Sequence, residues 1–283
     1  MSTIREISAT QITDAVAQLC ISACHDLPAD VEAALHRRHA EERSPVGKEI
    51  LGHIIQNAQL ARSRMIPICQ DTGFTSVLVE LGQDIHVSGG DLYEAIHAGV
   101  RKGYDEGLLR MSVLDHPLTR SNTKDNTPAA IHVEIVPGDQ VKIMVMPKGG
   151  GCENMSQLRI LKPSEGIEGV EKFVTECIAN AGPNACPPLV VGVGIGGTFD
   201  KCAFLAKKAL FREIGSRSPV PQDAELEESL LKLANETGLG PAGMGGDTTA
   251  LAIHIESYPC HITSLPVAVN VQCHAARHKE AVI

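Results

Sequence analysis

The sequence has no tryptophan, only five Phe and only three Tyr, so its core must be built mainly from aliphatic side chains. It also lacks any apolar run long enough for a signal peptide or a membrane span, which predicts a cytoplasmic protein without a membrane partner. A basic excess is absent too. The net charge of −9 argues against nucleic acid as a partner, because broad binding of phosphates needs a cationic face. An anionic ligand would therefore have to meet a local group of Arg, His and backbone N–H donors.

The chain is long enough to bury a substantial core, since it has 283 residues of which 43% are hydrophobic. We predict an α+β fold, with a helical N-terminal layer packed against mixed β-sheets. The expected organisation is one domain over residues 1–283, with a helical part over about 1–65 and a mixed α/β part over about 66–283.

Hydrophobic periodicity places further elements in the second part. Helices are expected at residues 91–104, 167–181, 199–211 and 224–237, and strands at 74–81, 129–136, 141–146, 189–193, 249–255 and 265–271. The Pro-Gly-Asp-Gln sequence at 137–140 predicts a hairpin between the two strands that flank it. His254 alternates within a strand, which favours a packed structural residue over a ligand.

The nine cysteines include no pair separated by two residues, the spacing typical of a closed structural metal site. In a reducing compartment they are thiols or metal ligands. Cys20, Cys24, Cys177 and Cys202 lie in helical apolar patterns and are expected to be small buried hydrophobes. Three others are expected on loops, namely Cys69 (Ile-Cys-Gln-Asp-Thr-Gly), Cys186 (Asn-Ala-Cys-Pro-Pro) and Cys273 (Val-Gln-Cys-His). Dispersed loop thiolates suit an iron–sulfur cluster that keeps one iron open.

Two segments are rich in glycine. Residues 192–197 match G-x-G-x-x-G between a strand and a helix, the local context of a dinucleotide site. The next segment lacks the following strand with an acidic end, so we expect a tight strand-to-helix turn packed beside Cys186 instead. In residues 147–154, three consecutive glycines indicate a backbone that approaches a ligand, where N–H groups at Gly150 and Gly151 could bind a carboxylate.

The three cysteine segments, in this order, resemble the N-terminal half of class I fumarate hydratases and tartrate dehydratases, and the resemblance covers nearly the whole chain. It implies a [4Fe–4S] cluster on Cys69, Cys186 and Cys273, whose fourth iron binds a small dicarboxylate substrate. Gln70 and Asp71 are adjacent to Cys69 and would be held close to this cluster, where Asp71 could hydrogen-bond the departing hydroxyl, although Asp71-Thr72-Gly73 is also a good turn. The implied substrate-binding residues are Gln70, Arg110, Gly150, Gly151 and His261.

The resemblance further implies an α subunit, because single-chain class I fumarases continue into a second domain, whereas this chain stops at Ile283. A separate β subunit, a dimer of αβ units and activity only in the complex are expected. Residues 121–128 are closer to fumarases, which favours hydration of fumarate to malate, a step of the tricarboxylic acid cycle. Cys152 stands where fumarases usually have Ser, as it does in tartrate dehydratases, so L-tartrate is the closest rival. A nicotinamide-binding oxidoreductase and a non-catalytic iron–sulfur or zinc module are the alternatives from other classes.

Overall fold

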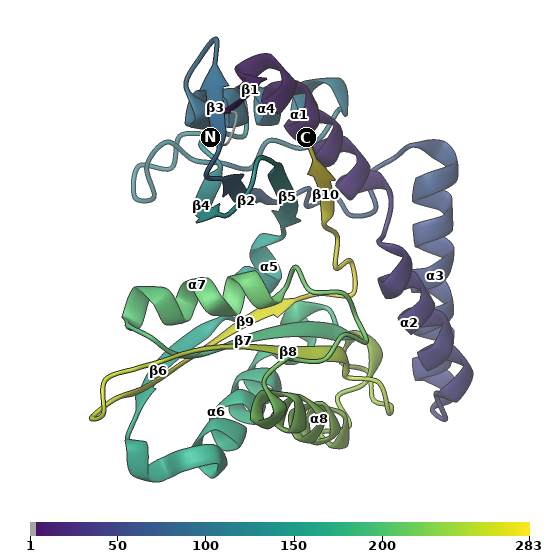
Figure 1. Ribbon diagram of the computed structural model, residues 1–283. Helices are drawn as coiled ribbons and strands as arrows, with labels where there is room; N and C mark the ends of the chain where they lie inside the picture. Colours follow the sequence, from purple (N-terminus) through teal and green to yellow (C-terminus); the bar gives the residue numbers. More distant parts are fainter. Residues whose placement is uncertain (1–3) are drawn as a thin grey trace. The chain divides into compact units, whose positions relative to one another are not determined.

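The computed structural model describes residues 4–283, which form two compact units made of interleaved chain segments (Figure 1). The first unit contains residues 4–28, Ala58–Gly150 and Arg277–Ile283, and the second contains Ala29–Asn57 and Gly151–Ala276. Helices and mixed sheets occur in the chain as expected for an α+β fold. The N-terminal helical segment is divided between the two units, because residues 4–28 belong to the first and Ala29–Asn57 to the second.

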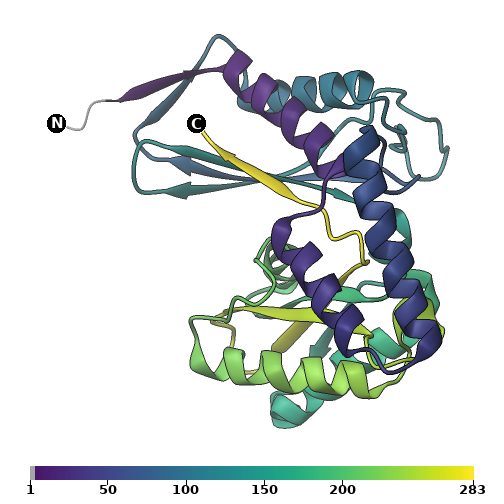
Figure 2. The ribbon, with the colours of Figure 1, turned by 90° about the vertical axis from the view of Figure 1, so that its right-hand side faces the viewer.

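The first unit is a four-stranded sheet with helices on one face (Figure 2). Its strand order is β10-β5-β2-β4, and a short parallel pair, β1 and β3, lies apart from this sheet. Ser8 caps the first helix through a reciprocal capping box with Gln11. Apolar side chains of both helices, such as Val16 and Ile96, are fully buried against the sheet. The elements are α1 (Ala9–His25), α4 (Leu92–Glu106), β1 (Arg5–Ser8), β2 (Phe74–Gly82), β3 (Ile85–Ser88), β4 (Ala130–Val136), β5 (Val141–Lys148) and β10 (Lys279–Val282).

The expected hairpin between β4 and β5 is wrong. β2 lies between these two strands, parallel to β4 and antiparallel to β5. Residues 137–140 instead cross the end of β2, where the N–H of Gly82 donates to the carbonyl of Gln140 at 2.9 Å. A Cβ on Gly82 would lie 2.5 Å from the carbonyl oxygen of Gly138, so glycine is required at this crossing. Residues 137–140 do reverse the direction of the chain, but strand order depends on β2, which is distant in sequence.

The second unit is a four-stranded sheet of order β6-β9-β7-β8 that has helices on both faces. α7 covers one face, and α6 and α8 cover the other (Figure 1). The elements are α5 (Gly150–Glu153), α6 (Gly166–Ala181), α7 (Phe199–Ala209), α8 (Pro221–Glu236), β6 (Gln157–Leu161), β7 (Leu189–Gly196), β8 (Ala250–Tyr258) and β9 (Leu265–Gln272), of which α5 begins at the last residue of the first unit. Two further helices are α2 (Ala29–Glu41), which lies wholly in the second unit, and α3 (Pro45–Arg64), whose residues from Ala58 onward belong to the first unit.

The glycines of the G-x-G-x-x-G segment serve helix packing. A Cβ on Gly192 or Gly194 would lie 2.1 Å from a backbone carbonyl oxygen of α7. These glycines therefore let α7 lie directly on β7, and the tight strand-to-helix turn is confirmed. Its expected place beside Cys186 is wrong, because Cys186 precedes the start of β7 and the turn follows its end.

His254 on β8 is a packed structural residue, as expected, with 1% of its surface exposed. Burial lowers the pKa of His254 to about 4, and the nearby Arg212 charge acts in the same direction. The unfolded chain binds a proton near pH 6.5, so it holds more protons than the folded chain between that pH and about 4. This group therefore makes the fold less stable as the pH falls.

We expect His254 to cost about 2 kcal/mol of stability between pH 7 and pH 5. The check is the free energy of unfolding in urea at both pH values for the wild type, His254→Leu and the exposed control His53→Gln. Only His254→Leu should reduce the loss. An identical pH dependence in all three proteins would assign the loss to other groups.

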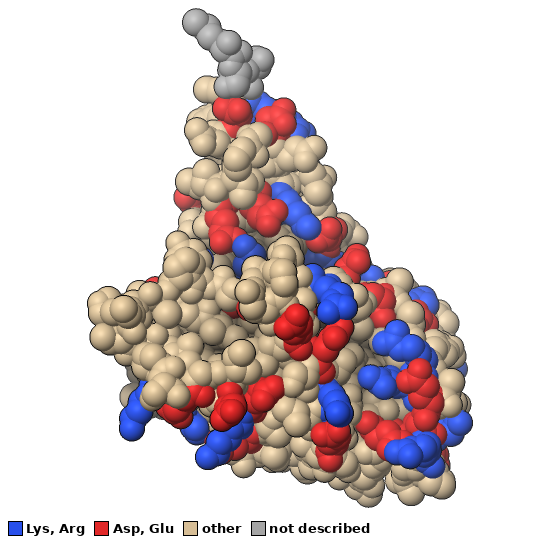
Figure 3. Space-filling view, turned by 60° about the horizontal axis from the view of Figure 1, so that its bottom comes forward, with Lys and Arg blue, Asp and Glu red and all other residues tan. Residues whose placement is uncertain are grey.

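Acidic and basic side chains are interspersed on the face shown in Figure 3. Among residues 4–283, no helix combines the length and hydrophobicity that a bilayer crossing requires.

Candidate functional site

Cys69 lies in a tight turn between α3 and β2, and its side chain is partly exposed. The N–H of Asp71 donates to Cys69 Sγ at 3.4 Å. The carboxylate of Asp71 accepts from the N–H of Gly73 at 2.9 Å, which closes the turn. These two hydrogen bonds fix the Cys69 side chain within the turn.

The glycine-rich loop reaches the same turn within the first unit. Its Gly150 N–H donates to Asp71 Oδ2 at 2.8 Å. This loop binds a carboxylate, as the three glycines suggested, but the carboxylate in the structure is that of Asp71. Gly150 also begins the single helical turn of α5.

Arg110 is exposed, and its main chain is tied to the cysteine turn. The hydroxyl of Thr72 donates to the Arg110 carbonyl at 2.8 Å. The first unit therefore brings together the segments of Cys69, Gln70, Asp71, Gly150 and Arg110. The side chains of Gln70 and Arg110 are solvent-exposed, and both carry donors suited to a carboxylate.

Two buried residues outside the predicted set of site residues hold this arrangement. Asn126 is fully buried; its Oδ1 accepts from the Ser112 N–H at 2.8 Å, and its Nδ2 donates to the Gly73 carbonyl at 3.2 Å. Arg277 is 3% exposed and donates from Nε to the Pro147 carbonyl at 3.0 Å and from Nη2 to the Asp71 carbonyl. The sequence feature that could have identified Arg277 is its position shortly after Cys273. For Asn126 it is the position within the 121–128 motif.

We expect Asn126→Gly to destabilise the first unit by roughly 2–4 kcal/mol, because two buried hydrogen bonds lose a partner. Glycine is the suitable replacement because Asn126 has φ 58°, where Ala would add backbone strain. Lys124→Gly is the matched control, since Lys124 is exposed and has φ 64°. Denaturant unfolding measures both. Equal stabilities would show that Asn126 does not hold the Arg110 segment.

Cys186 and Cys273 meet at one end of the sheet in the second unit. Cys186 lies three residues before the start of β7, and Cys273 directly follows the last residue of the antiparallel neighbour β9. His274 joins the two segments: its N–H donates to the Cys186 carbonyl at 3.2 Å, and its Nδ1 lies 3.1 Å from the same oxygen. A Cβ on Gly151 would lie 3.5 Å from the Asn184 carbonyl oxygen, so Gly151 is beside the Cys186 loop.

The other cysteines differ from these three. Cys20, Cys24, Cys177 and Cys202 are buried in helices, as expected. Burial raises the pKa of Cys24 to about 11 and the pKa values of Cys177 and Cys202 to about 12. These thiols are held protonated and are poor metal ligands. Cys260 is exposed, but its Sγ bonds to the Ser264 carbonyl at 3.2 Å in the β8–β9 loop.

His261 lies in that same β8–β9 loop, where it is exposed and its Nδ1 lies 2.8 Å from Thr263 Oγ1. The loop joins the end of β8 to the start of β9, whereas Cys273 follows the end of β9. A strand of eight residues spans about 26 Å at roughly 3.3 Å per residue. Within the second unit, the structure therefore does not bring His261 to Cys186 and Cys273.

The donor set suits a cluster better than a single ion. Within residues 4–283, no group of at least three His, Cys, Asp or Glu side chains is placed to hold one metal ion. A [4Fe–4S] cluster instead takes one thiolate for each ligated iron, so its cysteines are spread over several segments. Cys69, Cys186 and Cys273 fit that requirement because they lie in separate segments and each is exposed or partly exposed.

Comparison with known proteins gives consistent similarities. A family model described as Fumarate hydratase (Fumerase) matches residues 13–282. The Putative L(+)-tartrate dehydratase subunit alpha of Methanocaldococcus jannaschii is 45% identical over 273 residues, which cover 94% of this chain and 95% of that protein. The L(+)-tartrate dehydratase subunit alpha of an Escherichia coli strain is 36% identical over 277 residues, which cover 96% of this chain and 91% of that protein.

Proposed function

Because the chain belongs to the fumarate hydratase (Fumerase) family, we propose that it is the α subunit of a two-subunit iron–sulfur hydro-lyase. The reaction is the reversible loss of water from a four-carbon 2-hydroxy dicarboxylate, with malate and fumarate as the leading pair. The observation that carries the proposal is the state of the cysteines. Three are accessible cysteines in loops, and the segments of Cys186 and Cys273 are joined by His274.

Cys69, Cys186 and Cys273 would hold a [4Fe–4S] cluster. When bound, the cluster supplies a Lewis-acidic iron that polarises the bond between carbon and the departing hydroxyl. The N–H of Asp71 holds the Cys69 sulfur in its turn. His274 orders the backbone at Cys186, which keeps that thiol beside the Cys273 segment.

The substrate would be bound by Arg110 and Gln70 through its carboxylates, together with backbone N–H groups of Gly150 and Gly151. In the structure the Asp71 carboxylate occupies the Gly150 N–H. A substrate carboxylate that takes this donor would free Asp71 to accept a hydrogen bond from the substrate hydroxyl. His261 remains a proposed substrate contact, and it lies in the β8–β9 loop, at the end of β9 opposite Cys273.

The choice of substrate depends on two opposing observations. The names of the relatives favour L(+)-tartrate, which is the second candidate. Cys152 does not add to that case, because its side chain is 4% exposed and donates to Gln272 Oε1 at 3.2 Å in the core. The 121–128 segment, which favoured fumarate, acts through Asn126 on the main chain that carries Arg110.

The partner is proposed to be a β subunit, since the relatives are named as alpha subunits. A dimer of αβ units, a cytoplasmic location and a role in the tricarboxylic acid cycle complete the proposal. The nicotinamide alternative loses its main support, because Gly192 and Gly194 are explained by their packing against α7.

The test is anaerobic co-expression of the chain with its β subunit, followed by assays with L-malate and L(+)-tartrate. Dehydration of malate with higher kcat/KM supports the leading proposal, and faster dehydration of tartrate replaces it with the second. A colourless protein that contains zinc and no iron would contradict both. The chain purified alone should be inactive, and activity without the β subunit would contradict the two-subunit arrangement.

A further inference from the structure

A buried carboxylate on the turn between α2 and α3 anchors a distant glycine-rich loop of the second unit. Glu42 is 4% exposed and accepts the N–H groups of Ser44, Asp247 and Thr248 at 2.9–3.1 Å. Burial alone would raise the pKa of this carboxyl, but these hydrogen bonds hold it below its usual value. A Cβ on Gly246 would lie 3.0 Å from Glu42 Oε1, so the loop packs directly on the carboxylate.

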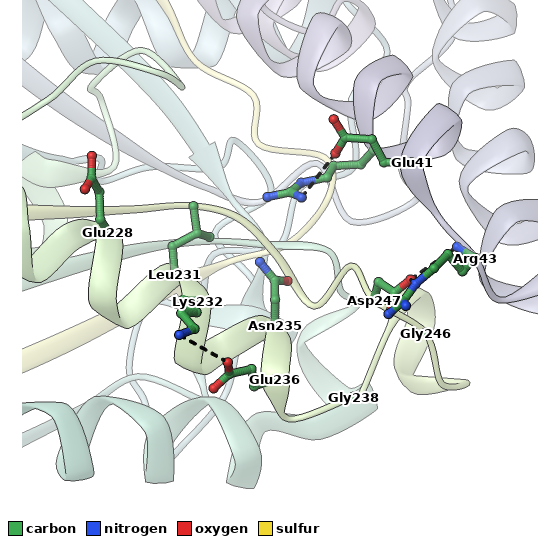
Figure 4. Close-up of a pocket in the computed structure, with 11 residues that line it drawn as sticks. Glu41, Arg43, Glu228, Leu231, Lys232, Asn235, Glu236, Gly238, Gly246 and Asp247 are labelled. Atoms are coloured by element: carbon green, nitrogen blue, oxygen red, sulfur yellow. Dashed lines mark hydrogen bonds and ion pairs between the residues drawn. The ribbon is translucent and has the colours of Figure 1, made fainter.

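The anchored loop, residues 240–248, is strained and compact. Ala242 has φ 53°, and four of its glycines also have positive φ. Conformations of this kind persist only where surrounding contacts enforce them. Arg43 adds an exposed contact, since its guanidinium donates to both carboxylate oxygens of Asp247 at 2.7 and 2.8 Å (Figure 4).

The other side of this loop contacts the residues that flank Cys186. The Ala242 N–H donates to the Pro187 carbonyl at 2.8 Å, directly after Cys186. Gly243 packs on Pro183, where an added Cβ would lie 2.7 Å from the proline Cβ. The Pro183 carbonyl in turn accepts the Cys186 N–H at 3.0 Å.

Cys186 itself needs such support. Its backbone is left-handed, with φ 54° and ψ 65°, a conformation that L-residues other than glycine rarely adopt. Two sets of contacts keep Cys186 in this conformation. The 240–248 loop contacts the residues beside it, and His274 binds its carbonyl oxygen.

We infer that Glu42 is a positioning residue for Cys186, acting through the 240–248 loop, and that it thereby governs how firmly the cluster is held at this ligand. The effect on cluster retention rests on the proposed function. Glu42 makes no contact with Cys186, so its role is to fix the loop that fixes the ligand.

Glu42→Gln tests the inference with little change of shape. The amide keeps one acceptor oxygen, but its NH₂ group faces a backbone N–H and cannot accept from it. The hydrogen bonds to one of the two carboxylate oxygens are therefore lost. In the cluster-free full chain, hydrogen–deuterium exchange at Asn184, Ala185 and Cys186 should become roughly tenfold faster, as expected for loss of a hydrogen bond to a charged group. Exchange in α7 should not change, which separates a local effect from general destabilisation.

Arg43→Ala serves as a second variant, because its side chain is 85% exposed and its loss leaves the fold intact. It should give a smaller acceleration at the same amides. Glu41→Gln and Arg38→Ala are the matched controls, since they break a neighbouring ion pair that does not involve the 240–248 loop. Neither control should alter exchange at residues 184–186.

The cluster provides the second readout. After anaerobic reconstitution with iron and sulfide, Glu42→Gln should lose its visible absorbance to a chelator roughly tenfold faster than the wild type and the controls. Wild-type exchange at residues 184–186 in Glu42→Gln, or in Arg43→Ala if Glu42→Gln does not fold, would overturn the inference. A wild-type chain that takes up no iron would refute the proposed function, while the exchange result still decides whether Glu42 positions Cys186.

Discussion

Replacement of Cys69, Cys186 or Cys273 by Ala is expected to abolish retention of a [4Fe–4S] cluster and, with it, all hydro-lyase activity. Each thiolate would hold a different iron, so no remaining ligand can replace the one that is lost. The measurements are iron and sulfide content and visible absorbance after anaerobic purification. Each variant should still fold, because these side chains lie in exposed or partly exposed loops.

Two cysteines outside this set provide the controls. Cys177→Ala should keep wild-type iron content, because burial raises the pKa of that thiol to about 12. Cys260→Ala tests an exposed thiol that is not an expected ligand. Full iron and sulfide content in any of the three ligand variants would remove that cysteine from the assignment.

Arg110→Ala is expected to leave the cluster spectrum intact and to reduce kcat/KM in the assembled enzyme by about 2–4 kcal/mol of transition-state binding. The reason is loss of a charge-assisted, bidentate hydrogen bond to a substrate carboxylate. Arg110 is exposed and its main chain is fixed by Thr72, so the substitution removes the guanidinium without disturbing the turn.

Arg37→Ala, an exposed change on α2, should leave kcat/KM at the wild-type value. Unchanged kcat/KM in Arg110→Ala would make Arg110 a surface residue. His261→Ala belongs in the same series, because its position at the other end of the β9 strand from Cys273 makes its contribution a direct test of the family resemblance.

Local patterns predicted most of the elements, because the period of burial along a segment is a property of that segment. The stripe of Ile12, Val16 and Leu19 forms the buried face of α1, and β7 is the continuous apolar strand that its sequence indicated. The short edge strands β1, β3, β6 and β10 were missed, since each has four or five residues and little periodicity. The β4–β5 hairpin failed for a different reason. Residues 137–140 reverse the chain direction as expected of a connection between antiparallel strands, but β2 lies between β4 and β5.

The sequence by itself determined the family, the α+β class and the separation of accessible cysteines from buried ones, because these depend on residue types and their immediate neighbours. Tertiary structure alone decided the strand order, the contact of Asp71 with Gly150, and the hold of Asn126 and Arg277 on the Cys69 turn. It also decided that Glu42 reaches the Cys186 loop through residues 240–248. Each of these contacts joins residues that are far apart in the chain, and such contacts form only when packing brings buried polar groups to the partners they require.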